Sequence, residues 1–195
     1  MTVKDDLPDQ VLDSISHQIG MLLPGLLQRQ PAPPVSVALA ESFEVWTLDL
    51  PKAVDALEPL AFPVRKARYW HHQVLFDGEV KAHAKSQMSP SQQARVLQVS
   101  ISPLAKKIDA AIEWVESPER EWATSDLVHV QLLAVESLLI YTFRLVEPKK
   151  VYVIDAFPGF VNLQPGQLLD EVGFLAALYS DLRSQKENYG DTGRR

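Results

Sequence analysis

The chain contains no cysteine, and this absence removes several classes of site at once. Without thiols it has no disulfide framework, no thiol nucleophile and no iron–sulfur or zinc–thiolate centre. Glycine is also scarce, with eight residues in 195. None of them forms a glycine-rich phosphate loop or the Gly-x-Ser-x-Gly elbow of a serine hydrolase. We therefore expect no nucleotide bound through a standard loop, and no cofactor.

Positive charge and long apolar runs are lacking as well. There are 19 lysines and arginines against 25 acidic residues, which gives a net charge of −6. An acidic chain is a poor match to nucleic acid or to an anionic membrane surface. No stretch approaches the roughly 20 apolar residues that span a bilayer, and the first ten residues have no apolar run typical of a secretory signal. We expect a cytoplasmic protein that binds neither nucleic acid nor membrane.

What the chain does have is the composition of a folded domain, with 46% hydrophobic and 23% charged residues. It shows no internal repeat and no interdomain linker, so we predict a single domain over residues 1–184. The remaining residues, 185–195, are polar and carry too little apolar surface to be held in place. They are predicted to form a disordered tail.

The spacing of apolar residues predicts the elements of that domain. Helices are expected over 6–23, stopped or kinked at Pro24-Gly25, from Ser102-Pro103 to Ser117, and from 168 to 182. A short helical turn is expected at 52–57. Strands are expected at 35–39 and 43–50, or as one long strand bent near Ala40, and at 95–101, with a hairpin formed by 137–146 and 151–157. This order favours an α+β fold, an antiparallel sheet with helices packed on one face.

The segment from Arg68 to Pro90 is predicted to be a hairpin. β-forming residues flank Asp77-Gly78, a dipeptide suited to a two-residue type I′ turn. Regular pairing across that turn would put four pairs on one face. These pairs are Phe76 with Glu79, Val74 with Lys81, His72 with His83, and Trp70 with Lys85.

This face carries the densest group of chemically reactive side chains in the sequence, and the group has three interpretations. His72 and His83 with Glu79 could hold a metal, but Glu79 lies two pairs away and no His-x-His or His-x-x-x-His spacing is present. His72, His83, Lys81 and Lys85 beside Trp70 suit a carboxylate-bearing ligand with an apolar ring. The third interpretation is a solvent-exposed polar face with no ligand. We assign no metal site.

Asp155 is a second candidate, because it lies in a strongly apolar strand, 151–157. The alternation places it on the side of Val151 and Val153. An acid among aliphatic residues either meets a cation or has a raised pKa. Arg144 on the facing strand is its expected partner, and an exposed edge position is the alternative.

The hairpin resembles that of the chorismate pyruvate-lyases. The similarity is carried by Arg-Tyr-Trp at 68–70, Asp-Gly-Glu at 77–79 and the alternating small residues before Pro90. It continues in order through Val-Ser-Val at 35–37, Ser102-Pro103-Leu104 and the strand at 150–157. It covers residues 15–158.

The resemblance implies a chorismate-lyase-like α+β fold that binds a small carboxylate, with or without release of pyruvate from chorismate to leave 4-hydroxybenzoate. In that family two arginines and a glutamate form the active site, and their positions correspond to His72, Lys85 and Asp155. His72 and Asp155 would then be catalytic, and Lys85, His72, His83, Trp70 and Arg144 would bind the substrate. The alternative is a non-catalytic interaction protein whose leucine-rich terminal helices dock on a protein partner or on a second copy.

Overall fold

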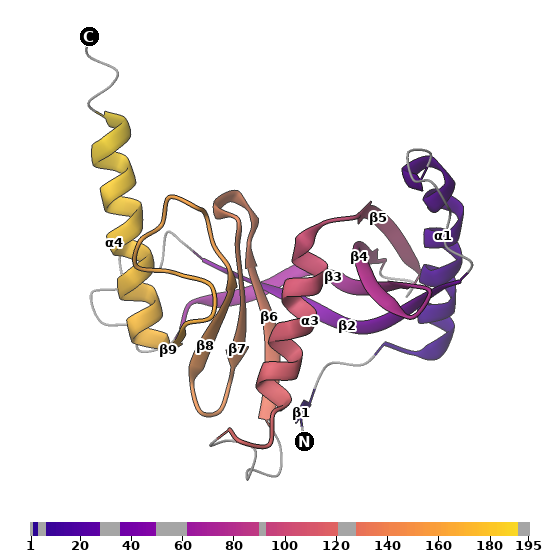
Figure 1. Ribbon diagram of the computed structural model, residues 1–195, viewed down its shortest axis with the longest axis horizontal. Coiled ribbons are helices and arrows are strands. Elements are labelled where there is room, and N and C mark those ends of the chain that lie inside the picture. The colour runs from indigo at the N-terminus through magenta and orange to yellow at the C-terminus, as the bar shows by residue number, and fades with distance from the viewer. Residues whose placement is uncertain are drawn as a thin grey trace.

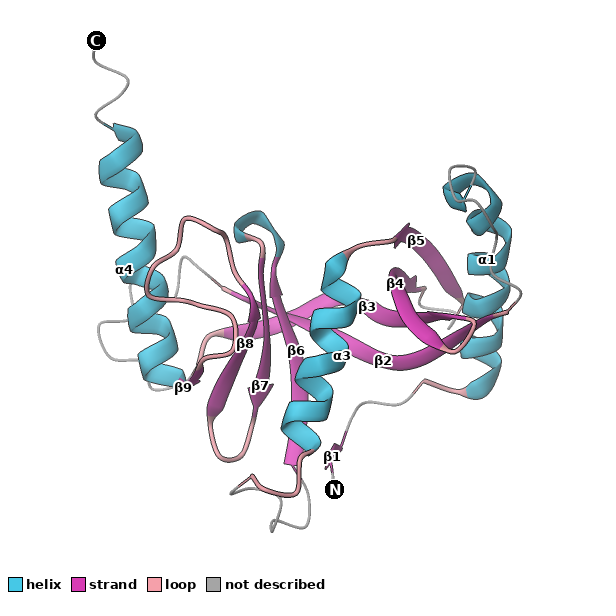
Figure 2. Ribbon diagram, viewed as in Figure 1, coloured by secondary structure: helices cyan, strands magenta, loops and turns pink. Residues whose placement is uncertain are grey.

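The computed structural model describes residues 2–3, 7–27, 36–49, 62–89, 93–120 and 128–190. Within these ranges the fold is α+β, as predicted, with helices packed against one large sheet (Figures 1 and 2). The helices are α1 (Asp9–Leu27), α3 (Pro103–Glu116) and α4 (Glu171–Gly190), and η2 (Glu136–Leu138) is a single 3-10 turn. None of the helices described is long and apolar enough to cross a membrane.

The sheet has two antiparallel halves. One half contains β2 (Val37–Leu48), β3 (Val64–Phe76), β4 (Glu79–Met88) and β5 (Ala94–Ser100). The other contains β6 (Val128–Val135), β7 (Ile140–Leu145), β8 (Lys150–Asp155) and β9 (Leu168–Asp170). The strand order is β5-β4-β3-β2-β6-β7-β8-β9, and the halves join through a parallel pairing of β2 with β6. The short β1 (Thr2–Val3) also pairs with β6 in parallel.

Helices cover both faces of the sheet, whereas the sequence analysis expected them on one. The neighbours Leu132 and Leu133 on β6 are both fully buried, the first in the core beneath α3 and the second in the core beneath α4. Successive side chains of a strand point to opposite faces, so α3 and α4 lie on opposite sides. A third core joins α1 to the β3–β4 hairpin and β5.

Helix α3 was predicted accurately because two independent signals coincide. Pro103 occupies its first turn, where a missing N–H costs nothing. Its apolar stripe is buried as expected, and the helix ends before Ser117. The buried residues include Leu104, Ile108, Ala111, Ile112 and Val115.

Elsewhere the predicted boundaries needed correction. Pro24-Gly25 does not stop helix α1, which continues to Leu27. Of the two alternatives for 35–50, two strands or one bent strand, the second is confirmed: β2 is a single strand whose pairing shifts between Leu39 and Ser42, close to the expected bend. The helical turn predicted at 52–57 lies outside the described residues.

Helix α4 begins later than predicted. Leu168 and Leu169 belong to β9, which pairs with β8, and Val172, expected in the apolar stripe, is 64% exposed. Among the α4 side chains that the structure describes, the buried ones are Phe174, Leu175, Leu178 and Asp181. The helix continues to Gly190, so it extends into the segment predicted as a polar tail.

Candidate functional site

The β3–β4 hairpin turns at Asp77-Gly78 as predicted, and both residues have positive φ. Phe76 pairs with Glu79 and Leu75 with Val80, but the regular register ends there. A bulge at Lys81 shifts the remaining pairs by one residue: Val74 pairs with Ala82, His72 with Ala84, and Trp70 with Ser86. The predicted pairs of His72 with His83 and of Trp70 with Lys85 are therefore wrong.

The bulge divides the predicted site between two faces. A shift of one residue exchanges the faces of a strand. His72 lies on the face that packs against α1, and alternation puts Trp70 on the same side. His83 and Lys85 lie on the other face, beneath α3, because the Nδ1 of His83 is 3.2 Å from the Oγ of Ser102 at the start of that helix.

His72 is fully buried, and both of its ring nitrogens have partners. Nδ1 lies 2.8 Å from the Oγ of Ser42 on β2, and Nε2 lies 2.7 Å from the Oγ of Ser86 on β4. Burial lowers the pKa of His72 to about 4, so the ring is neutral at physiological pH. A neutral imidazole bonded across three strands has no free donor for a ligand, and it holds the strands together instead.

On the α3 face, His71 and His83 stack on each other. Their ring centroids are 5.0 Å apart, and the side chains are 2% and 6% exposed. Burial, and then the positive charge of Lys85, lowers the pKa of His83 to about 4. Burial, followed by the other two histidines and Lys85, also lowers the pKa of His71. The pair is therefore neutral and carries no positive charge for an anion.

Lys85 provides the positive charge on this face, next to Tyr69 and Glu136 of η2. Its ammonium forms an ion pair with the Glu136 carboxylate and lies 5.5 Å from the centroid of the Tyr69 ring. The Tyr69 hydroxyl donates a 2.7 Å hydrogen bond to the same Glu136 oxygen. Partial burial raises the pKa of Glu136, but the hydrogen bonds from Lys85 and Tyr69 outweigh it, and the net pKa lies below the ordinary value. We call Tyr69, Lys85 and Glu136 the Lys85 cluster.

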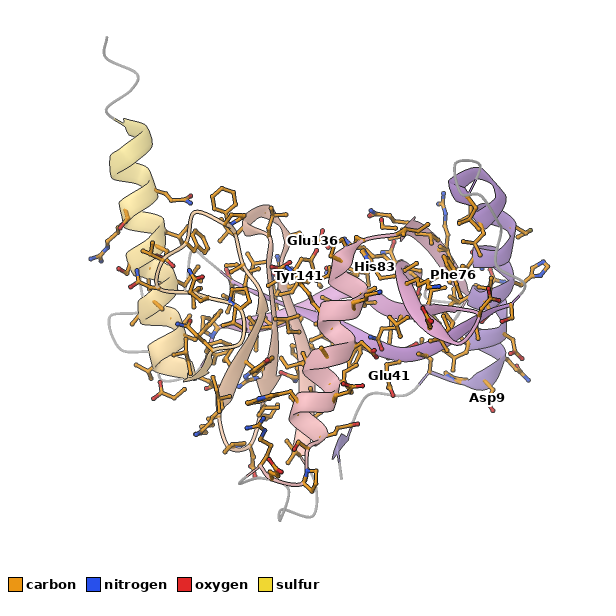
Figure 3. The ribbon with its side chains drawn as sticks, viewed as in Figure 1. Asp9, Glu41, Phe76, His83, Glu136 and Tyr141 are labelled. Atoms are coloured by element: carbon orange, nitrogen blue, oxygen red, sulfur yellow. The ribbon has the colours of Figure 1, made fainter. Side chains whose placement is uncertain are left out.

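Asp155 lies close to this cluster. It pairs with Tyr141 of β7 after a bulge at Ile154, and its carboxylate accepts a 2.8 Å hydrogen bond from Lys107 of α3. Val151 and Val153 pack in the core beneath α4, so the prediction that Asp155 shares their face is wrong. Burial, then the charges of Glu136 and Asp155, raises the pKa of Tyr141. Figure 3 shows Glu136, Tyr141 and His83 gathered around the N-terminal end of α3.

Arg144 is not the partner of Asp155. Its Nε donates a 2.7 Å hydrogen bond to Glu171 at the start of α4, and its Nη1 donates to Gln131. Its guanidinium lies 5.1 Å from the centroid of the Phe62 ring, in the core beneath α4. Arg144 therefore belongs to the side of the sheet opposite Asp155, because the bulge in β8 changes which residues share a face.

A cavity of about 630 Å³ lies between the hairpin and the middle of α3. Its lining includes four acidic side chains and one basic one, together with the buried amide of Gln73. We call it the acidic groove. The charged residues that line it are Glu41, Glu79, Asp109, Glu113 and Lys106.

Sequence reasoning did not identify Tyr69, Glu136 or Gln73. Tyr69 lies within the Arg-Tyr-Trp triplet of the resemblance, and its alternation with the buried His71 was a usable signal. Glu136 reaches the site because η2 turns the chain back, with Leu139 in a left-handed conformation at its end. No local pattern predicts that contact. Among the residues described, no group of three or more histidine and acidic side chains is placed to hold a metal ion.

Comparison of the chain with models of protein families, with curated proteins and with solved structures finds no match.

Proposed function

We propose that the protein is a small-molecule-binding domain for an aromatic or cyclic compound with a carboxylate, which binds at the Lys85 cluster in place of Glu136. One observation carries this proposal: an ammonium and a phenol hydroxyl converge on a single carboxylate. Glu136 thus occupies the position that a ligand carboxylate would take. The arrangement supports the carboxylate ligand expected from the sequence, with Tyr69 in the role that the sequence analysis gave to His72.

The surroundings support exchange of one carboxylate for another. The Lys85 side chain is 15% exposed, so its charge needs a partner in both states. The Glu136 side chain is 46% exposed and belongs to a single 3-10 turn, so it can rotate into solvent.

Binding is tested by calorimetry with chorismate and 4-hydroxybenzoate as probes. Glu136→Gln keeps the size of the side chain and removes the competing charge, so both probes should bind more tightly than to the wild type. Lys85→Met should weaken binding at least about tenfold, because a charge-assisted hydrogen bond is lost. Glu147→Gln, the same substitution in the exposed β7–β8 turn, is the control and should change nothing.

Two outcomes decide the proposal. If neither probe binds the wild type or Glu136→Gln, carboxylate binding at this cluster is refuted. If binding occurs, the chorismate mixture is followed for 4-hydroxybenzoate by its absorbance after separation. If the wild type forms 4-hydroxybenzoate and Lys85→Met does not, the protein has lyase activity in addition to binding. If the wild type forms no 4-hydroxybenzoate, the function is limited to binding.

A further inference from the structure

We infer that the acidic groove is a second binding site, and that its ligand is an elongated organic cation carrying more than one amino group, such as a linear polyamine. This site is separate from the Lys85 cluster, since none of the three residues of that cluster lines the groove. The inference does not depend on the proposed function.

The groove has the shape and lining for such a ligand. It is lined by the hairpin turn at Gly78, by one side of α3 and by Glu41 of β2. Figure 3 shows Glu41 beside the helix. Apolar side chains line it between the charges, and they would contact the methylene segments of an alkylamine. These apolar residues are Ala40, Leu75, Val80, Ala110 and Ile112.

The charges favour a cation. Four carboxylates line the groove together with one ammonium, that of Lys106, and Glu79 also forms a 3.1 Å ion pair with Lys81, so the lining keeps a negative excess. Clefts lined by one sign of charge concentrate the field and attract ligands of the opposite sign. The carboxylates belong to β2, β4 and α3, so they are spread along the groove.

Gln73 gives the second, independent indication of a ligand. Its side chain lines the groove and is fully buried, its Nε2 donates to the carbonyl of Ala105 at 3.4 Å, and its Oε1 has no hydrogen-bond partner. A buried amide oxygen without a partner is costly and uncommon in folded proteins. An ammonium or secondary amine in the groove would donate the missing hydrogen bond.

The arrangement does not suit a metal ion. Among the described residues no three acidic or histidine side chains lie close enough to share one. Carboxylates spaced too widely for one ion are matched by a ligand with several positive charges held apart by methylene groups. The groove therefore favours a polyamine over Mg²⁺ or Ca²⁺.

The test measures spermidine binding to the full chain by calorimetry at physiological ionic strength, with Mg²⁺ as a second titrant. Spermidine should bind one site saturably, and Mg²⁺ should not. The double variant Asp109→Asn with Glu113→Gln changes only the helix surface, and it should weaken spermidine binding at least about tenfold, because two charge-assisted contacts are lost. Glu119→Gln with Glu147→Gln removes the same charge outside the groove and should leave binding unchanged.

Gln73→Leu separates this site from a general attraction to negative charge. It preserves the net charge and the volume, and it should weaken spermidine binding about tenfold through the lost acceptor. Three results would each overturn the inference: no saturable binding, equal weakening in the two double variants, or unchanged affinity in Gln73→Leu with folding confirmed by circular dichroism. Carboxylate binding at the Lys85 cluster is measured separately, so the proposal for one site can be refuted while the proposal for the other stands.

Discussion

The two faces of the β3–β4 hairpin carry similar polar residues, but the hydrogen bonding of these residues differs between the faces. On the face toward α1, His72 is buried with both ring nitrogens bonded to serines. On the face toward α3, the Nε2 of His71 and the Oε1 of Gln73 are buried without partners. Buried polar groups that are fully satisfied stabilise a fold, whereas unsatisfied ones cost free energy. The first face is organised for stability, and the second has unused hydrogen-bonding capacity and is the face on which we propose binding.

Lowering the pH should destabilise the protein through the buried histidines on both faces of the hairpin. We expect this loss of stability to be the largest of the effects predicted here. His72 and His83 have folded-state pKa values near 4, against 6.5 in the unfolded chain. The unfolded chain therefore takes up protons first, and stability falls as the pH decreases from 6.5 toward 4. Each of the two histidines should cost about 2 kcal/mol at pH 5 relative to pH 7, and His71 acts in the same direction.

Urea unfolding at pH 7, 6 and 5 measures this loss. His17→Asn, which changes an exposed histidine of α1, should show the same pH dependence as the wild type. A free energy of unfolding that stays constant between pH 7 and 5 would show that these histidines are not held neutral.

The substitution His72→Leu should have the next largest effect and act on the first face alone. It leaves the hydroxyls of Ser42 and Ser86 without the ring that joins them, and Ser86 is fully buried. We expect a loss of about 3 kcal/mol at pH 7, since each orphaned buried group costs about 1–3 kcal/mol. Urea unfolding of the variant measures it, and a loss below about 1 kcal/mol would remove the contrast between the faces.

The substitution Gln73→Leu should have the smallest effect on stability. It removes an unsatisfied oxygen together with one long hydrogen bond to Ala105, and it adds apolar contact beneath α3. These contributions oppose each other, so the free energy of unfolding should change by less than about 1 kcal/mol. A loss as large as that of His72→Leu would mean that Gln73 is a structural residue, like His72.

The local elements were predictable because their signals are local. Ser102-Pro103 and the spacing from Leu104 to Val115 define α3 without reference to the rest of the chain. Asp77-Gly78 likewise fixes the hairpin turn. Consecutive apolar residues at Leu132 and Leu133 also signalled a strand buried on both faces, but the sequence analysis did not use that signal.

The site was only partly predictable, because bulges at Lys81 and Ile154 decide which residues share a face. A bulge adds one residue to one strand, and neither position differs in sequence from regular strand. The sequence placed Lys85, His83 and Asp155 on the correct strands. It assigned His72 to the wrong face and missed Glu136, whose contact with Lys85 depends on how η2 brings the chain back over the sheet.

The parallel pairing of β2 with β6 also has a consequence for the order of folding. Each half of the sheet is built mainly from strands adjacent in the chain, so its hydrogen bonds close short loops. The pairing of Val45 with Leu132 joins distant segments, and the loop between them includes the hairpin, β5 and α3. Loop closure costs more entropy for distant segments, and such contacts slow folding. The halves can therefore form early, while the junction sets the overall folding rate.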